Sequence, residues 1–342
     1  MTMTDDALSP AEFAATAARA IAACAGLAAR QQAERLGGDG LLGVMAGEEV
    51  GGLDLPLAFA VPVAAAASTG LLGFPLLETL LLGRSLQSRL PDVSRAIVSG
   101  AQCATIAWTH AASTEPKEDG VLLSGWVGRA PCAADVDWLL VRVGENAAAL
   151  VSAAASGVTV EGPTGLDLTM PEYTVRFDNV SVAKRYLLPE GTWPALQSEA
   201  MVLRAAAIMG SAEACLALAQ EHASMRRQFG HALSYNQAIR HALARHKLGL
   251  ESIRYAITRC LAREPGTLER HAAFLAAAAY GVAISQGALQ IHGGMGFTWD
   301  VPVHRHLRRI LVLQAQGDAS GLLRALGHRY VSEIAPASEA AA

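Results

Sequence analysis

The hydrophobic pattern of this 342-residue chain changes twice, and the two changes divide it into three parts. Residues 1–98 have the alanine-rich, apolar pattern of short helices, beginning with a predicted helix from about Pro10 to Leu36. Residues 99–190 contain short runs of β-branched and aromatic residues separated by Gly, Asp, Asn and Pro, which is typical of strands. Residues 191–342 return to helical spacing. Helices, then strands, then longer helices predict an α+β fold of three domains.

Two local periods support this division. Residues 173–177 alternate between apolar and polar side chains, which is the period of a half-buried strand. In the last part, apolar residues recur at spacings of three, four and seven and form one stripe of a long helix: Ile239, Leu243, Leu250, Ile253, Ile257 and Leu261. The sequence 264–266, Glu-Pro-Gly, predicts the end of that helix. A further helix is predicted over about 268–289, before Gly293 and Gly294.

The composition excludes several classes of protein. Only 17% of the residues are charged and 52% are hydrophobic, which argues against a disordered chain. The formal net charge of −4 provides no basic surface, so we expect no nucleic-acid partner. The five cysteines are odd in number and form no C-x-x-C pair, which argues against a disulfide framework. Neither His304 with His306 nor His241 with His246 has the spacing of a zinc-binding helix, so no metal is expected.

No targeting segment is predicted. The first twenty residues lack the basic region of a secretory signal. Residues 56–77 carry no charge and are long enough to span a bilayer, but Pro62, Pro75 and two glycines favour short, broken helices. We therefore expect buried helices, no membrane segment and a cytoplasmic location.

Four motifs occur in the order found in the acyl-CoA dehydrogenase family. "GLLGVMAGEEVGG" (40–52) is similar to a motif of its N-terminal domain, and "YTVRFDNVSV" (173–182) resembles the end of its β-domain. "RRQFG" (226–230) resembles its R-x-x-F-G motif, and "QIHGGMGF" (290–297) its Q-x-x-G-G-x-G-F motif. The resemblance covers nearly the whole chain. It implies the acyl-CoA dehydrogenase fold: an N-terminal helical domain, a middle β-barrel-like strand domain and a C-terminal four-helix bundle.

The last two motifs have side chains suited to a cofactor. Arg226 carries a permanent charge on a planar fork that matches a pyrophosphate, and paired glycines let a backbone approach a ligand closely. The resemblance implies that six residues hold the adenine and pyrophosphate part of FAD, reaching across a dimer interface into the neighbour's flavin site: Arg226, Phe229, Leu233, Gln290, Gly293 and Gly294. The alternative is a solvated arginine at a helix end and glycines that only cap a helix.

The family's catalytic base is missing from its usual position. The reaction removes a proton from Cα and a hydride from Cβ of an acyl thioester, with a glutamate as the base. Counting from Gln290 puts Gly317 at the position of that glutamate. Gln314 and Gln316 lie nearby, but an amide cannot act as a base near neutral pH. Asp318 is the nearest carboxylate, and its side chain is one carbon shorter.

Some members carry the base on the helix that precedes R-x-x-F-G. That position falls on Ala200, and Glu199 stands one residue away, about 100° around the helix. We therefore expect no catalytic residue in this chain, with Glu199 and Asp318 as the alternatives.

Two segments that contact the flavin ring in the family also differ here. Thr109 keeps the threonine of the T-E-P-x-x-G-S-D loop, but the glycine, serine and aspartate are absent. The later Thr-Glu-Pro at 114–116 is either a displaced copy or chance. The family's W-I-T segment falls on Gly128 and Ala130, and Trp126 is a poorly placed substitute.

The chain thus keeps the residues it would lend to a neighbour and lacks those it would use itself. It resembles the smaller, catalytically silent subunit of the heteromeric (α2β2) acyl-CoA dehydrogenases of bacterial steroid side-chain degradation. The resemblance implies a larger catalytic subunit as partner and an acyl-CoA with a bulky or steroid tail as substrate of the complex. One alternative is a self-sufficient homo-oligomeric enzyme with Glu199 as base. The other is a flavin-free scaffold or CoA-binding protein.

Overall fold

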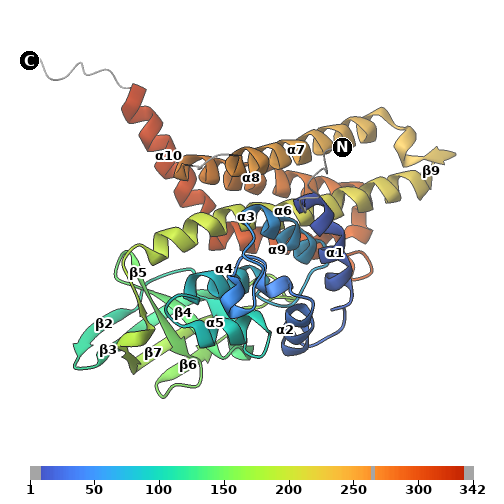
Figure 1. The fold of residues 1–342 in the computed structure, drawn as a ribbon. Helices are drawn as coiled ribbons and strands as arrows, with labels where there is room; N and C mark the ends of the chain where they lie inside the picture. The colour runs from blue at the N-terminus through green and yellow to red at the C-terminus, as the bar shows by residue number, and fades with distance from the viewer. Residues whose placement is uncertain (1–8, 263–265, 335–342) are drawn as a thin grey trace, which may run out of the picture.

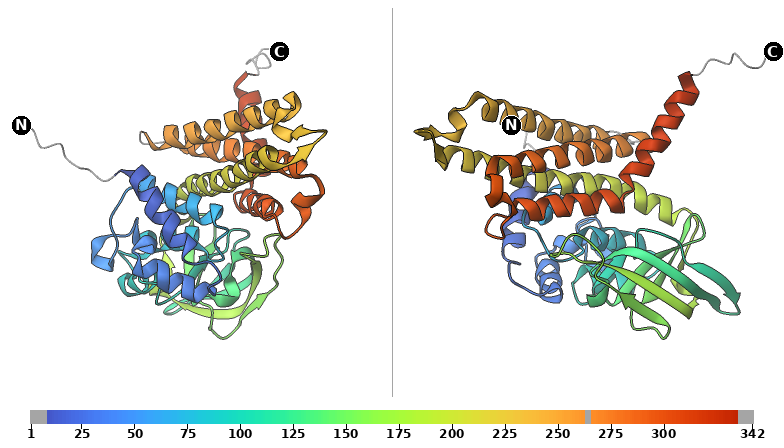
Figure 2. Two further views of the ribbon diagram at one scale, coloured as in Figure 1. Left: turned by 90° about the vertical axis from the view of Figure 1, so that its right-hand side faces the viewer. Right: turned by 180° about the vertical axis from the view of Figure 1, so that it is seen from behind.

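The computed structural model describes residues 9–262 and 266–334 of the chain. The N-terminal helices and two β-sheets lie along one side of a bundle of long helices, as Figures 1 and 2 show. The N-terminal part contains α1 (Pro10–Ala22), α2 (Ala29–Gly38), α3 (Leu57–Thr69), α4 (Leu76–Leu86) and α5 (Pro91–Val98).

The single helix predicted from Pro10 to Leu36 is wrong, because two helices occupy this segment. Helix α1 ends at Ala22, and the chain turns through Gly26 with a φ of 77° before α2 begins. This left-handed conformation suits glycine, which has no Cβ to clash with the backbone, and it ends the helical repeat. At the other end of α1, the side chain of Ser9 accepts a hydrogen bond from the Glu12 amide in a capping box.

Two described segments are long and apolar enough to cross a membrane by composition alone, Thr192–Met225 and Thr267–Phe297. In the most apolar 18-residue window of each segment, 72% of the residues in the first and 50% in the second are buried inside the protein. Both are bundle helices, and helices that are apolar on all sides are typical of a protein interior. The uncharged segment 56–77 forms α3 and the start of α4, with a turn between them.

The middle part consists of two four-stranded sheets. In the first, the strand order is β1-β4-β5-β8, and in the second it is β2-β3-β7-β6. The prediction of a half-buried strand at 173–177 is confirmed, because Val175 and Phe177 are buried while Arg176 is exposed. The strands are β1 (Ala104–Ile106), β2 (Ser113–Lys117), β3 (Gly120–Pro131), β4 (Trp138–Val143), β5 (Ala147–Ser152), β6 (Val158–Glu161), β7 (Glu172–Ala183) and β8 (Leu187–Leu188).

The C-terminal part is a bundle of α6, α7, α8 and α9, from which α10 extends away (Figure 1). The predicted apolar stripe of α7 is confirmed at Leu250, Ile253 and Ile257, which are all buried. The described part of α7 ends at Leu261, and the predicted stop at Glu264-Pro265 lies outside the described residues. The helices are α6 (Thr192–Met225), α7 (Gln237–Leu261), α8 (Thr267–His292), α9 (Val303–Gln316) and α10 (Ala319–Ile334).

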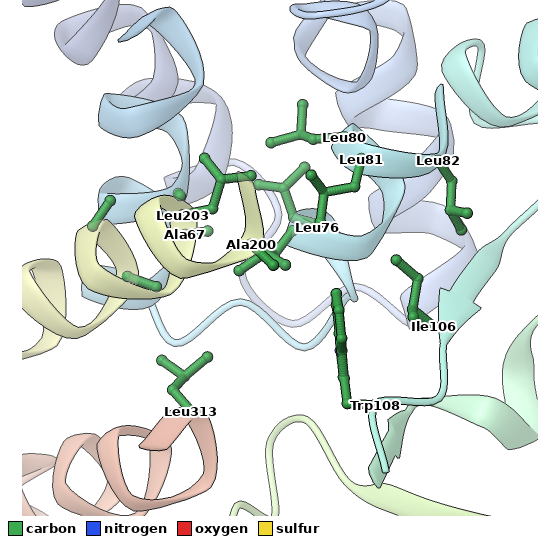
Figure 3. Packing of buried hydrophobic residues seen from close by; sticks show 14 of the residues in the cluster. Ala67, Leu76, Leu80, Leu81, Leu82, Ile106, Trp108, Ala200, Leu203 and Leu313 are labelled. Carbon is green, nitrogen blue, oxygen red and sulfur yellow. The ribbon is translucent and has the colours of Figure 1, made fainter. Parts of the chain in front are cut away.

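Helix α6 lies between the N-terminal helices and the rest of the bundle, and small residues let its neighbours approach closely. A Cβ added at Gly210 would come within 2.1 Å of the Ala65 carbonyl oxygen in α3, so only glycine fits there. Figure 3 shows how side chains from separate parts of the chain meet in this core: Leu76, Leu80 and Leu81 from α4, Trp108 from the segment after β1, Ala200 and Leu203 from α6, and Leu313 from α9.

One buried arginine connects all three parts of the chain. The guanidinium of Arg309 in α9 pairs with Asp167, in the segment between β6 and β7. It also donates to the Leu72 carbonyl oxygen at 3.0 Å and to the Thr169 hydroxyl at 2.9 Å. Burial alone would raise the pKa of the Asp167 carboxyl, but the charge of Arg309 and the hydrogen bonds from Thr169 bring that pKa below its usual value.

We predict that Arg309→Ala strongly destabilises the protein. The substitution leaves Asp167 buried without its counter-charge, which typically costs about 3–5 kcal/mol. Urea unfolding of wild type and variant measures the difference in the free energy of unfolding. The matched control is Arg176→Ala, which breaks the exposed ion pair with Glu161 and should cost less than about 1 kcal/mol.

Because folding lowers the pKa of Asp167, the stability that this residue contributes should depend on pH. Because that pKa is lowered on folding, the carboxylate stabilises the protein fully at neutral pH, and the stabilisation is lost as pH falls from about 4 through the folded-state pKa. The gap in unfolding free energy between wild type and Asp167→Asn should therefore narrow in acid. A gap that stays constant down to pH 3 would contradict this assignment.

Candidate functional site

The six residues predicted to bind the cofactor all lie at one end of the helical bundle. Arg226 caps the C-terminus of α6 and leads into a short hairpin, β9 (Arg227–Gln228) and β10 (His231–Ala232), which Figure 1 shows beyond the ends of the helices. The Leu233 amide donates to the Arg226 carbonyl oxygen at 2.9 Å and closes the hairpin. Gln290 lies in the last turn of α8, and the two glycines begin the short helix 293–297.

Contacts between aromatic rings hold the ends of α6 and α8 together. His222 stacks on His292 with ring centroids 4.5 Å apart, and the His292 Nδ1 atom is 2.8 Å from the Ala288 carbonyl oxygen. The two sequence motifs, more than sixty residues apart in the chain, therefore form one surface, which we call the bundle tip: residues 226–235 and 290–297.

Most of the predicted residues of the bundle tip face outward. Phe229 is 94% exposed at a φ of 53°, and among the described residues the Arg226 and Gln290 side chains have no hydrogen-bond or ion-pair partner. A Cβ added at Gly293 or Gly294 would meet nothing within 4 Å. Only Leu233 packs partly against the core. A bulky exposed aromatic in a left-handed conformation, beside an unpaired arginine, is the arrangement of a binding surface rather than of a packed core.

A second region, a hollow of about 770 Å³, lies between the β-sheets and the bundle. Positions of the acyl-CoA dehydrogenase motifs meet here, both the retained Thr109 and the altered Gly128 and Gly317. Thr109 and Gly317 line it, and Gly128 pairs with Thr109 through two backbone hydrogen bonds of 3.1 and 3.2 Å. Hereafter this hollow is called the interdomain pocket.

The position of the missing glutamate has no room for a side chain. A Cβ added at Gly317 would come within 2.4 Å of the Phe274 ring, which is fully buried in α8. Because phenylalanine fills this space, a glutamate at 317 would require Phe274 to move. Sequence counting could place Gly317 here, but it could not reveal the opposing ring.

Each polar side chain near Gly317 makes a hydrogen bond within the protein, although the buried Oε1 atom of Gln316 has no partner among the described residues. Gln314 donates to the Ala278 carbonyl oxygen at 2.6 Å, and Gln316 donates to Glu172 at 2.9 Å. The Asp318 carboxylate accepts from the Gly321 amide at 3.1 Å, which is a cap at the start of α10. The structure thus gives Asp318 a role in ending one helix and starting the next.

Glu199 does not reach the interdomain pocket. Its carboxylate pairs with Arg84 of α4 at 3.1 Å and lines a separate hollow with Ser85 and Thr192. The neighbouring Ala200 is fully buried in the core. Glu199 is one residue before the position of the family's base, Ala200, and this offset places the Glu199 carboxylate on a different side of α6.

The two possible substitutes for the flavin-contacting segments also lie elsewhere. Residues 114–116 belong to the exposed strand β2 and do not line the pocket. The Trp126 ring does not line the pocket; it lies against the ring of the pocket residue His110, tilted by 41° with centroids 3.8 Å apart, and remains 46% exposed. Within the described ranges, 9–262 and 266–334, no group of three or more His, Cys, Asp or Glu side chains is placed to hold a metal ion.

The sequence analysis missed a buried charged cluster at the inner wall of the pocket. The Arg204 guanidinium lies 3.9 Å from the ring centroid of Trp108, whose indole N–H donates to Glu78 at 2.8 Å. Burial raises the pKa of the Glu78 carboxyl. Burial also lowers the pKa of Arg204 to about 10, and the carboxylates of Glu78 and Glu172 oppose that change. The sequence signal was an arginine within the apolar run 201–210.

Comparisons with known proteins agree with this architecture. Residues 193–329 match the family model described as acyl-CoA dehydrogenase, C-terminal domain. Over 319 residues, the chain is 30% identical to acyl-CoA dehydrogenase FadE28 of Mycobacterium tuberculosis, and the alignment covers 90% of each protein. In other curated relatives, at 31–36% identity, the chain spans only about a third of their length.

Two solved structures superpose on nearly the whole chain. The Tcur3481-Tcur3483 steroid ACAD has a TM-score of 0.87 at 23% identity, covering 96% of this chain and 99% of the matched one. The ChsE4-ChsE5 complex from Mycobacterium tuberculosis also has a TM-score of 0.87 at 23% identity, covering 98% and 99%. At this identity the likeness concerns the fold.

The exposure of Phe229 leads to a prediction about stability. Phe229→Gly removes a side chain with few contacts and relieves a left-handed backbone conformation, so the melting temperature should stay the same or rise slightly. The control is Phe274→Ala, which empties a fully buried site and should cost about 3–5 kcal/mol. Thermal unfolding of the purified chain measures both. A marked loss of stability in Phe229→Gly would mean that this residue serves the fold.

Proposed function

Because this chain belongs to the acyl-CoA dehydrogenase family, whose members use FAD, we propose that it is the non-catalytic subunit of a heteromeric acyl-CoA dehydrogenase. In this proposal a larger partner subunit supplies the catalytic base and the flavin-ring pocket. The present chain supplies the bundle tip, which reaches across the interface to the adenine and pyrophosphate part of FAD. The assembly is a heterotetramer with two chains of each kind.

The observation that carries the proposal is the separation of the two regions within one chain. The bundle tip presents Arg226, Phe229 and Gln290 outward, where another chain can meet them. The interdomain pocket has Phe274 in the space that a base at residue 317 would need. A chain whose bundle tip is exposed and whose position 317 is blocked by Phe274 is suited to complete the active site of a partner chain.

The residues of the bundle tip fit the phosphate-bearing end of FAD. Arg226 has an exposed planar guanidinium with no partner among residues 9–262 and 266–334, and such a fork matches two oxygens of a pyrophosphate. Phe229 offers an exposed aromatic face to a flat ring. The backbone at Gly293 and Gly294 is open to close approach. When bound, FAD supplies the acceptor for the hydride that leaves the substrate Cβ.

For the substrate, we propose an acyl-CoA with a bulky or steroid tail, bound in the complex. Support comes from the name of one similar structure, which is a steroid ACAD. A self-sufficient homo-oligomer would need Glu199 as base, but that carboxylate pairs with Arg84 outside the pocket. Flavin stoichiometry separates the readings, because one FAD per two chains favours the heteromer and one FAD per chain the homo-oligomer.

We predict that Arg226→Ala weakens FAD binding by the assembled complex about tenfold to hundredfold. The change removes a charge-assisted contact worth about 1.5–3 kcal/mol. Excess FAD should restore activity by mass action, because the catalytic base lies in the partner. Arg226→Lys should restore binding only in part, since an ammonium cannot make the planar two-point contact. Titration with FAD, followed by flavin fluorescence, measures the affinity.

The control for this experiment is Arg227→Ala, the adjacent exposed arginine on strand β9. It should bind FAD as wild type does. If Arg226→Ala also binds FAD as tightly as wild type, the chain lends no arginine to the cofactor and the proposed role is wrong.

We also predict that Glu199→Gln and Asp318→Asn leave the turnover of the complex nearly unchanged. Loss of a true general base lowers the rate on the order of 10²-fold or more. Asparagine at 318 still caps α10, so the fold is preserved. The assay is acyl-CoA-dependent reduction of an electron acceptor by the purified complex. A hundredfold loss at either position would move the base into this chain.

A further inference from the structure

Two stacked histidine rings join the halves of the bundle tip at its base. His222 lies one helical turn before Arg226, whose amide donates to the His222 carbonyl oxygen at 2.8 Å, so both side chains share a face of α6. His292 is the last residue of α8 and directly precedes Gly293. The two ring centroids are 4.5 Å apart and the ring planes differ by 30°. This contact therefore brings the arginine of one motif and the open glycine backbone of the other to the same place.

The two rings differ in their hydrogen bonds. The His292 Nδ1 atom is 2.8 Å from the Ala288 carbonyl oxygen, and because a carbonyl only accepts, Nδ1 carries the hydrogen of the neutral ring. The His222 ring is half-buried and makes no hydrogen bond or ion pair within residues 9–262 and 266–334. Its ring nitrogens are therefore free to take up a proton and to donate a hydrogen bond to a ligand.

The charges around His222 oppose its protonation. Burial lowers the pKa of the His222 imidazole, and the charges of His292 and Arg226 lower it further. Among the residues that the structure describes, no carboxylate offsets these charges at His222. His222 is therefore neutral near pH 7 in the free chain, and a bound anion would favour its charged form. The other charged or titratable side chains on the elements at this end of the bundle are Glu221, Arg227, His231, Tyr235, Arg240 and Asp300.

We propose that His222 makes a second, proton-dependent contact to the phosphate groups of the cofactor at the bundle tip. This inference rests on the proposed function, in which Arg226 meets the pyrophosphate of FAD. In the free chain the neutral His222 ring stacks on His292. Beside a pyrophosphate the ring takes up a proton and donates from a ring nitrogen to a phosphoryl oxygen. FAD then binds together with a proton, so the affinity of the bundle tip depends on pH.

The direction of this dependence follows from the linkage between the two equilibria. Because the protonated ring contacts the anion and the neutral ring does not, bound FAD raises the pKa of His222 above its value in the free chain. FAD affinity should therefore increase as pH falls, and it should level off once the free chain is itself protonated. The expected gain is about tenfold, the lower end for a charge-assisted hydrogen bond, because His292 and Arg226 oppose the new charge.

The test is a titration of the purified complex with FAD, followed by flavin fluorescence, from about pH 8 to about pH 5.5, which spans the ordinary pKa of histidine. Wild type should bind FAD about tenfold more tightly at the acid end of this range. His222→Phe keeps an aromatic ring against His292 but takes up no proton, so its affinity should not increase in acid. The matched control is His241→Phe, an exposed histidine of α7, which should keep the full dependence.

A second measurement counts the protons directly. Calorimetry of FAD binding near pH 7, in two buffers with different enthalpies of ionisation, gives the number of protons taken up on binding. Wild-type complex should take up protons, and His222→Phe should take up fewer. Because the wild-type result needs no variant, it decides the question even if His222→Phe does not assemble.

The inference is overturned if wild type binds FAD equally well across the pH range, if FAD binding takes up no proton, or if His222→Phe keeps the dependence. Failure of the proposed function gives a different result, because Arg226→Ala then binds FAD as tightly as wild type at every pH. If Arg226→Ala weakens FAD binding while His222→Phe keeps the pH dependence, the cofactor-lending role stands and only the role of His222 is wrong.

Discussion

The arrangement of the three parts of this chain depends on the buried guanidinium of Arg309. Through Asp167, Thr169 and the Leu72 carbonyl oxygen, this group connects the bundle to the β-domain and to the N-terminal helices. Two turns further along α9, Gln316 repeats the connection by donating to Glu172. These polar contacts have fixed geometry, unlike the surrounding apolar packing, so they orient α9 against the segments that carry Leu72, Asp167 and Glu172.

The placement of α9 separates the molecule into two surfaces with different properties. At the bundle tip, Phe229 is exposed, Arg226 and Gln290 have no partner in the part of the chain that the structure describes, and Gly293 and Gly294 leave the backbone open. The interdomain pocket is a partly open hollow within one chain, and the guanidinium groups of Arg204 and Arg142 lie over the rings of Trp108 and Trp193. A surface that faces outward can contribute to an assembly only when a partner arrives, whereas the pocket is lined by residues of one chain.

The sequence predicted the features that depend on local periodicity and missed those that depend on distant residues. The apolar stripe of α7 and the alternation in β7 follow from the spacing of side chains, and both are confirmed. The helix predicted from Pro10 to Leu36 failed because one glycine at Gly26 changes the direction of the chain. The assignment of the cofactor residues at the bundle tip stays a prediction. The Arg204–Trp108 stack could not be predicted, because it joins residues about a hundred positions apart that no local pattern relates.

The contact between Gly317 and Phe274 also bears on how such a chain can change over evolutionary time. A glutamate at 317 cannot be accommodated while the Phe274 ring lies 2.4 Å from the position of its Cβ. A smaller residue at 274, introduced first, would carry the cost of a cavity with no gain in activity. The two substitutions are therefore accommodated only together, so no single mutational step places a glutamate at 317 in this fold.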